Sequence, residues 1–154
     1  MNRAFITFLI AIFAVPYSFA GEPPEWFYKA IKVSNANELA YFIEMNDSCP
    51  FTKDEVNKIA EGVLIRSRIK PLKEEIFVSG RIYLRLGISC VKWNDSSQVF
   101  SINSEFGRYI PEPGIIFDYS FGFIGIGSKD YIEQNFKSST ESAVTAFMKA
   151  NFNL

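Results

Sequence analysis

The stretch that decides the fold is RIYLRLGISCV, residues 81–91, in which apolar side chains occur at every second position. Because a β-strand turns successive side chains to opposite faces of a sheet, this alternation predicts a strand with one buried face. The buried face would carry Ile82, Leu84, Leu86, Ile88 and Cys90, and the other face Arg81, Tyr83, Arg85 and Ser89. We expect this second face to be polar and accessible to partners.

The segments around this strand predict a small sheet. Residues 98–106 alternate in the same way after a polar turn, and residues 115–126 follow a second turn that contains two prolines and a glycine. Three consecutive strands of this kind form an antiparallel meander. Upstream, residues 39–45 are short, apolar and aromatic, which predicts one further strand.

Two helices are predicted. Thr52 and Glu55 form a T-x-x-E capping box, which predicts a helix that begins there and runs to about Ile69, before Pro71. The last segment carries a second apolar helical stripe, formed by Ile132, Phe136, Ala143, Val144 and Phe147.

Two local assignments stay open. A second capping signal, Ser138 with Glu141, would allow a break in the last helix. Residues 26–33 fit a short helix and a strand equally well.

The element order β-α-β-β-β-α predicts an α+β fold with two layers. We expect a four-stranded, mostly antiparallel sheet with the helices packed on one face, so that the other face stays uncovered. With 48% hydrophobic residues the chain has ample material for one core, and residues 21–154 are predicted to form a single domain.

The first twenty residues predict export. Arg3 precedes an apolar run over residues 4–15, Pro16 interrupts it, and Ser18-Phe19-Ala20 places small residues where a signal peptidase cleaves. The run is shorter than the roughly 20 residues that a membrane-spanning helix needs. We therefore expect a cleaved signal peptide and a mature chain from residue 21 that is periplasmic or secreted, without stable membrane insertion.

The chain has two cysteines, Cys49 and Cys90, and an even number in an exported protein predicts a disulfide. Closing a loop of about 42 residues would stabilise the fold by roughly 4 kcal/mol in the chain-entropy model. The alternative, a reactive thiol or a metal ligand, lacks a CxxC spacing and a histidine partner.

Composition narrows the function classes. The chain has no histidine, which excludes Ser/His and Cys/His catalysis and the commonest zinc ligand. A net charge of −1 gives no indication of nucleic-acid binding. We expect a non-enzymatic protein, without cofactor or metal, that binds another protein or an envelope component; the sequence leaves the oligomeric state open.

The candidate recognition surface combines two segments. Arg81, Tyr83 and Arg85 lie on the polar face of the predicted strand, and Tyr109 and Ile110 lie beside the following Pro-Gly turn. Arginine and tyrosine are over-represented among the residues that dominate binding energy at protein interfaces.

The alternative is a hydrolase without a cofactor that cleaves an envelope glycan with two carboxylates. Four acids near predicted strand ends are candidates for the pair: Glu44, Asp47, Glu105 and Asp118.

The segment Ser79-Gly80-Arg81-Ile82-Tyr83 resembles the S-G-x-x-Y signature of the periplasmic lysozyme inhibitors. The resemblance covers these five residues and implies that Ser79 and Tyr83 contact a lysozyme cleft. That family folds as an all-β barrel, whereas this chain has two strong helix signals, so its fold does not carry over.

Overall fold

The structure of the chain, a computed structural model, describes residues 22–73, 75–111 and 115–152. The predicted signal peptide lies outside these residues. The elements in chain order are α1 (Glu25–Ala30), β1 (Glu38–Met45), α2 (Lys53–Arg66), β2 (Lys70–Lys73), β3 (Ile82–Lys92), β4 (Gln98–Arg108), β5 (Ile115–Gly127) and α3 (Lys129–Phe152). The segment with two possible assignments, residues 26–33, thus begins with the helix α1, which buries Phe27.

The sheet has five strands in the order β2-β1-β3-β4-β5. Strand β1 pairs parallel with both β2 and β3, whereas β3 with β4 and β4 with β5 pair antiparallel. The α+β class is confirmed, but the prediction of four mostly antiparallel strands is wrong, because the sheet is mixed and has a fifth strand. The missed strand β2 has only four residues and contains Pro71, which a short edge strand tolerates because its outer side needs no ladder donor.

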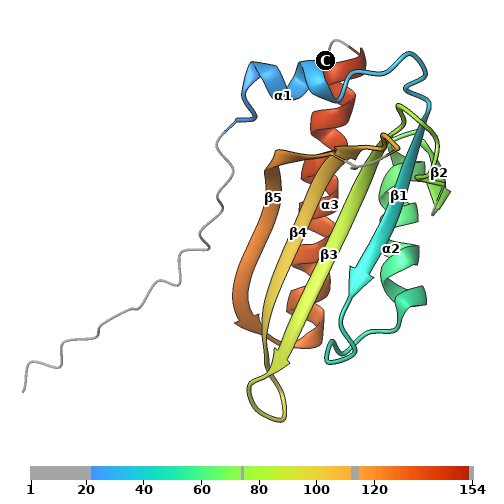
Figure 1. Ribbon diagram of the computed structural model, residues 1–154. Coiled ribbons are helices and arrows are strands. Elements are labelled where there is room, and N and C mark those ends of the chain that lie inside the picture. Colours follow the sequence, from blue (N-terminus) through green and yellow to red (C-terminus); the bar gives the residue numbers. More distant parts are fainter. Residues whose placement is uncertain (1–21, 74, 112–114, 153–154) are drawn as a thin grey trace, which may run out of the picture.

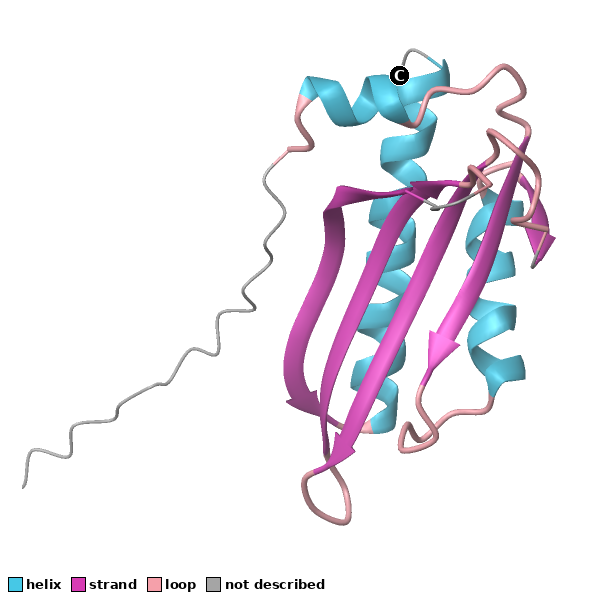
Figure 2. Ribbon diagram, in the orientation of Figure 1, coloured by secondary structure: helices cyan, strands magenta, loops and turns pink. Residues whose placement is uncertain are grey.

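The helices lie on one face of the sheet, as Figures 1 and 2 show. Helix α2 packs behind β1 and β2, and α3 packs behind β4 and β5. The main core fills the space between the layers; its largest fully buried side chains include Tyr41, Leu84, Leu86, Phe100, Phe106, Phe136 and Phe147. The opposite face of the sheet carries no helix among the described residues (Figure 2).

The capping box of α2 is confirmed. The Glu55 N–H donates to Thr52 Oγ1 at 3.2 Å, and the Thr52 N–H donates to the Glu55 carboxylate at 2.6 Å. The helix ends at Arg66 rather than near Ile69, because Arg68 adopts a φ of 59°. The Arg68 N–H then bonds to the Ile65 carbonyl and the Ile69 N–H to that of Leu64, a Schellman closure without its usual glycine.

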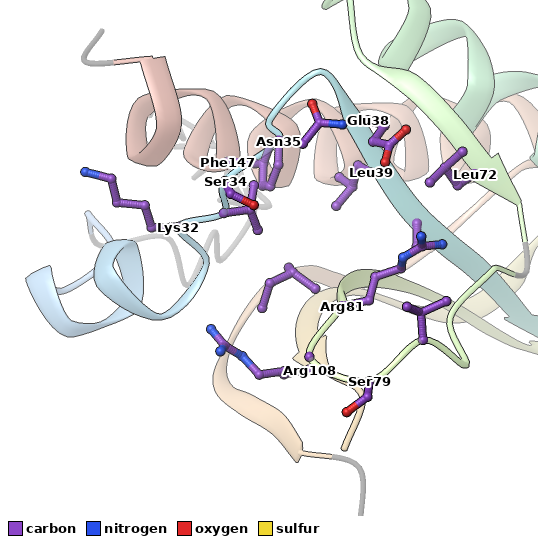
Figure 3. Close-up of a pocket in the computed structure, with 15 residues that line it drawn as sticks. Lys32, Ser34, Asn35, Glu38, Leu39, Leu72, Ser79, Arg81, Arg108 and Phe147 are labelled. Atoms are coloured by element: carbon purple, nitrogen blue, oxygen red, sulfur yellow. The ribbon is translucent and has the colours of Figure 1, made fainter. Parts of the chain in front are cut away.

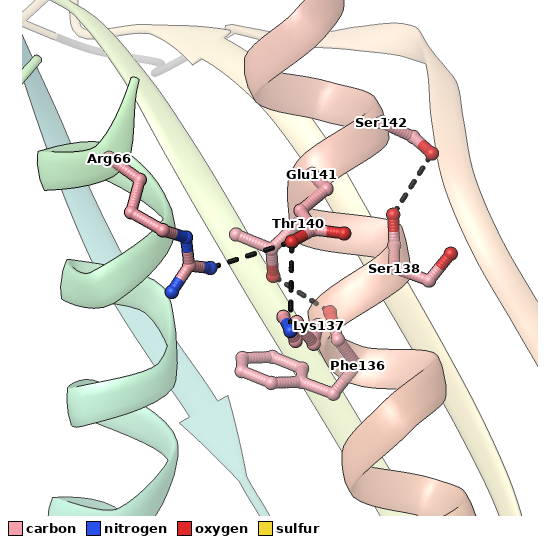
Figure 4. A network of polar contacts seen from close by, with 7 residues as sticks. All are labelled: Arg66, Phe136, Lys137, Ser138, Thr140, Glu141 and Ser142. Carbon is pink, nitrogen blue, oxygen red and sulfur yellow. Dashed lines mark hydrogen bonds and ion pairs between the residues drawn. The ribbon is translucent and has the colours of Figure 1, made fainter. Parts of the chain in front are cut away.

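Helix α3 runs without a break, although the sequence allowed one at Ser138. The hydroxyls in that region bond to carbonyls of the preceding helical turn and do not cap a new helix. Thr140 donates to the Phe136 carbonyl at 2.8 Å and Ser142 to that of Ser138 at 2.9 Å (Figure 4). In the same region Glu141 accepts from Arg66 of α2 at 3.4 Å, which joins the two long helices.

The predicted disulfide between Cys49 and Cys90 is confirmed. It ties the segment before α2 to β3, and Asn46 reinforces the junction by exchanging two hydrogen bonds of 2.9 Å with the backbone of Cys90. A buried disulfide is compatible with an oxidising compartment. Within the described part of the chain, no helix is long and apolar enough to cross a membrane.

Candidate functional site

The uncovered face of the sheet carries polar side chains together with exposed apolar ones such as Val91, Ile124 and Ile126, and it has a small second core at one end. Ala40, Leu72 and Tyr83 are buried there, and Phe42, Ile76 and Tyr109 pack against them. Ile76 belongs to the loop between β2 and β3, which lies over this end of the sheet. The loop therefore closes part of a face that the strand pattern alone predicts to be open.

Tyr83 lies on the predicted face, but only 7% of it is exposed, so the expectation that it is accessible is wrong. Its ring is 5.6 Å from that of Phe42, and burial raises the pKa of its hydroxyl. Tyr83 is buried because the β2–β3 loop and Tyr109 cover it. The alternation of residues along β3 cannot predict this, because it depends only on the sequence of the strand itself.

Arg85 occupies the middle of the uncovered face and forms an ion triad with Glu44 and Glu105. Its Nε and Nη2 donate to Glu44 Oε2 at 3.0 and 2.5 Å, and its Nη1 donates to Glu105 Oε2 at 2.6 Å. The hydrogen bond to Glu44 is the main cause of the raised pKa of the guanidinium. Arg85 is thus already paired with two acids of its own chain.

The triad also bears on the four acids proposed as hydrolase candidates. Glu44 and Glu105 both pair with the guanidinium of Arg85. The acid of a glycosidase must instead donate a proton to the leaving oxygen, so this arrangement does not favour the two residues as a catalytic pair. Asp118 borders a shallow hollow of about 490 Å³ together with Glu105, and Asp47 lies in the exposed loop after β1.

The other predicted residues gather at the end of the sheet where β4 meets the β2–β3 loop. The Gly80 N–H donates to the Tyr109 carbonyl at 2.7 Å and the Tyr109 N–H to the Arg81 carbonyl at 2.9 Å, which continues the β3–β4 ladder. The φ of Gly80 is 77°, a conformation that favours glycine at this turn. Arg81 also donates to the Glu75 carbonyl at 2.8 Å.

This end of the molecule exposes apolar side chains outside the set predicted from the sequence. Phe77 is 74% exposed, and its ring meets that of Tyr109 edge to face at 5.5 Å. Val78 is exposed and Ile110 half-buried. We call the set Phe77, Val78, Arg81, Tyr109 and Ile110 the loop-end patch. The run Ile76-Phe77-Val78 between polar residues was the available signal, but it indicates a buried segment as readily as an exposed one.

Two further expectations from the sequence can be compared with the structure. Of the segment that resembles the lysozyme inhibitors, Ser79 and Gly80 are exposed in the loop, whereas Tyr83 is buried in β3, so the segment does not form one protruding loop. Of the predicted Pro-Gly turn, residues 112–114 lie outside the described residues.

We also searched the described residues for metal-binding clusters and compared the sequence with known proteins. Among the described residues, no group of three or more His, Cys, Asp or Glu side chains could hold a metal ion. No known protein family matches the sequence, and no curated protein matches it.

Proposed function

We propose that the chain is an exported, non-enzymatic binding protein that recognises a protein partner through the loop-end patch. The observation that carries this proposal is the exposed ring of Phe77, which meets the partly buried ring of Tyr109 edge to face. Large aromatic rings left in water lose the free energy that burial would give, about 25 cal/mol per Å², and a partner surface can recover it.

The patch stands on a rigid support, which favours binding. Tyr109 is held by two backbone hydrogen bonds to residues 80 and 81, and Ile76 of the same loop is packed in the second core. Because the surface is ordered before a partner arrives, less conformational entropy is lost on association.

The chemistry of the patch fits a protein better than a glycan. Aromatic side chains and arginine are enriched at the centres of protein interfaces, and here the backbones of Arg81 and Tyr109 are joined by a hydrogen bond. An envelope component without apolar groups would leave the Phe77 ring unburied.

Two independent features support export, the leader sequence and the disulfide. The leader has the three parts of a secretory signal peptide, and the disulfide joins the only two cysteines of the chain. We propose that cleavage after Ala20 releases the mature protein into the periplasm or the medium. Intact-mass measurement of the exported protein should give a chain beginning at Gly21; full-length protein retained in the cytoplasm would contradict this.

Capture that depends on the patch tests the binding function. The mature, oxidised protein is immobilised and exposed to an envelope extract, beside the double variant Phe77→Ala/Tyr109→Ala and the control Trp93→Ala. Trp93 is a matched control because it is 65% exposed and lies at the opposite end of β3, in the β3–β4 hairpin.

The patch variant should lose a protein that both the unmodified chain and Trp93→Ala retain. Equal capture by all three proteins would overturn the assignment of the patch, and so would retention of a glycan alone. Hydrolysis of the glycan that is lost on Glu105→Gln would favour the carboxylate hydrolase instead.

A further inference from the structure

The two edges of the sheet differ in how well they are protected. Strand β2, at one edge, has four residues, Lys70-Pro71-Leu72-Lys73. Short length, proline and lysine are features that keep an edge strand from pairing with another chain. Strand β5, at the other edge, has 13 residues and faces no further strand of the sheet on its outer side (Figure 1). It therefore offers a long edge to which another strand can be added.

The second half of β5 carries none of these protective features. Residues 120–127, Ser-Phe-Gly-Phe-Ile-Gly-Ile-Gly, contain no charge and no proline. They pair with residues 98–105 of β4 in an unbroken register, and the irregularity of this ladder lies before them, opposite the step from Glu105 to Gly107. A regular, uncharged edge of this kind is a template for strand addition.

Strand β5 also leaves most of its large apolar side chains incompletely buried. From residue 116 onward, Phe121 is the only one of them that is buried. On the helix-covered face three rings are partly buried: Phe117, Tyr119 and Phe123. On the uncovered face Ile124 is 80% exposed and Ile126 is 54% exposed. A strand added to this edge would cover side chains on both faces.

We propose that the added strand is β5 of a second copy of this chain, antiparallel to the first across a two-fold axis. An edge without charge offers a foreign strand no charge to match, whereas it presents a copy with no like charge to repel it. A two-fold axis brings the same surface of both copies together, so each contact occurs twice. The two sheets would then form one continuous sheet with the helices of both copies on the same side.

The side chains of residues 120–127 favour one register. When Phe123 lies opposite Phe123 of the second copy, Ile124 lies opposite Gly122 and Ile126 opposite Ser120. Each isoleucine thus meets a small residue. The Ile124 side chains of the two copies become diagonal neighbours beside the axis, about 7–8 Å apart, which is within reach of long side chains.

The size of the paired segment predicts a reversible dimer. A standard protein interface has about 20–30 residues on each side. Residues 120–127 contribute only part of that number, even with the partly buried rings of Phe117 and Tyr119 beside them. The fraction of dimer should therefore depend on concentration.

This seam lies away from the loop-end patch. The patch and the cleft of about 380 Å³ beside it, which shares Val78 and Arg81, lie at the end of the sheet where β1 and β3 begin (Figure 3). Residues 120–127 instead run along β4 from its hairpin end. Dimer formation would therefore leave the loop-end patch accessible to a partner.

Sedimentation of the mature, oxidised protein over a hundredfold range of concentration tests the proposal. The average mass should rise from that of one chain towards that of two. Ile124→Lys places two like charges beside the axis and should raise the dissociation constant at least tenfold. Val91→Lys is the matched control, because Val91 is 65% exposed on the same face but belongs to the inner strand β3. It should leave the dissociation constant unchanged.

Cross-linking tests the register. Residue 120 of one copy would lie opposite residue 126 of the other, with Cβ atoms about 4.5–5.5 Å apart. Ser120→Cys/Ile126→Cys should therefore form a covalent dimer on mild oxidation, whereas Ser120→Cys alone should not. Within one chain the two positions are six residues apart on an extended strand, too far for an internal disulfide.

The mass of a single chain at every concentration would overturn the proposal. A dimer that Ile124→Lys leaves intact, equal weakening by Val91→Lys, or cross-linking through Ser120→Cys alone would do the same. Loss of the dimer in Phe77→Ala/Tyr109→Ala would place the contact at the loop-end patch instead. Capture of a partner from envelope extract is measured separately, so failure of either proposal leaves the other standing.

Discussion

The two faces of the sheet are made by alternate residues of the same strands and have opposite characters. On β4, Phe100, Ile102 and Phe106 point into the helix-covered core and are fully buried, whereas the intervening polar residues are partly exposed at Ser101 and exposed at Asn103. Neighbouring residues of one strand therefore serve different purposes: one side chain stabilises the core, and the next is available for recognition. Substitutions on one face should damage the fold, and equally large substitutions on the other should spare it.

The largest effect expected from this comparison is at Phe106. Its ring is fully buried and stacks on that of Phe147 with centroids 6.0 Å apart. Phe106→Ala should lower the free energy of unfolding by about 3–5 kcal/mol, from lost burial and the cavity left behind. Ile124→Ala is the open-face counterpart: Ile124 is 80% exposed, and the cost should be under about 0.5 kcal/mol. Urea unfolding measures both; similar losses would end the distinction between the faces.

The disulfide belongs to the covered face and should give the next largest effect. Cys49 and Cys90 are both buried in the main core, with 41 residues of sequence separation. Cys49→Ala/Cys90→Ala should lower the free energy of unfolding by about 2–4 kcal/mol, because the unfolded chain gains freedom. Urea unfolding of the double variant, beside the unmodified protein with and without reductant, measures this. Two titratable thiols in the native exported protein would contradict the pairing.

The covered face was the part of the fold that sequence could predict. Alternation in residues 81–91 and the capping box at Thr52 depend on neighbours in the chain, and both appear in the structure. The parallel pairing of β1 could not be predicted in the same way, because it depends on where α2 returns the chain. Strand β2 pairs through residues 70–73 only, and its proline removes the pattern that would mark a strand.

The candidate site was harder to predict, because the β2–β3 loop determines which residues of the uncovered face are exposed. Local pattern placed Arg81, Tyr109 and Arg85 on or near the uncovered face, but it could not show that Glu44 and Glu105 already hold Arg85. Nor could it separate Phe77, which is exposed, from Ile76 beside it, which packs against the second core. These outcomes are set by contacts between residues far apart in sequence.

Tyr83 sharpens the comparison, because it lies on the uncovered face and is nevertheless buried. Tyr83→Ala should lower the free energy of unfolding by about 2 kcal/mol, the lower end for a large buried side chain, while Tyr83→Phe keeps the packed ring and should cost much less. Arg85→Ala should cost about 1 kcal/mol or less, because its ion pairs are partly exposed to water. Thermal and urea unfolding distinguish the three variants. A loss at Tyr83 as small as that at Ile124 would mean that the β2–β3 loop does not form a second core.

The smallest effect concerns how the two long helices are joined over the covered face. Glu55, at the start of α2, accepts a hydrogen bond of 2.8 Å from Lys129 of α3, and this bond and those from Thr52 lower the pKa of its carboxyl from 4.5 to about 2. The folded chain therefore binds this proton less readily than the unfolded chain. The resulting stabilisation is complete above about pH 5 and is lost as the pH falls towards 2. Glu55→Gln should flatten the dependence of the melting temperature on pH in that window, and Lys129→Gln should reduce it in the same direction. Lys137→Gln removes a cation from the same helix without touching Glu55 and should leave the slope unchanged; equal slopes in all four proteins would show that this pair does not couple the helices to pH.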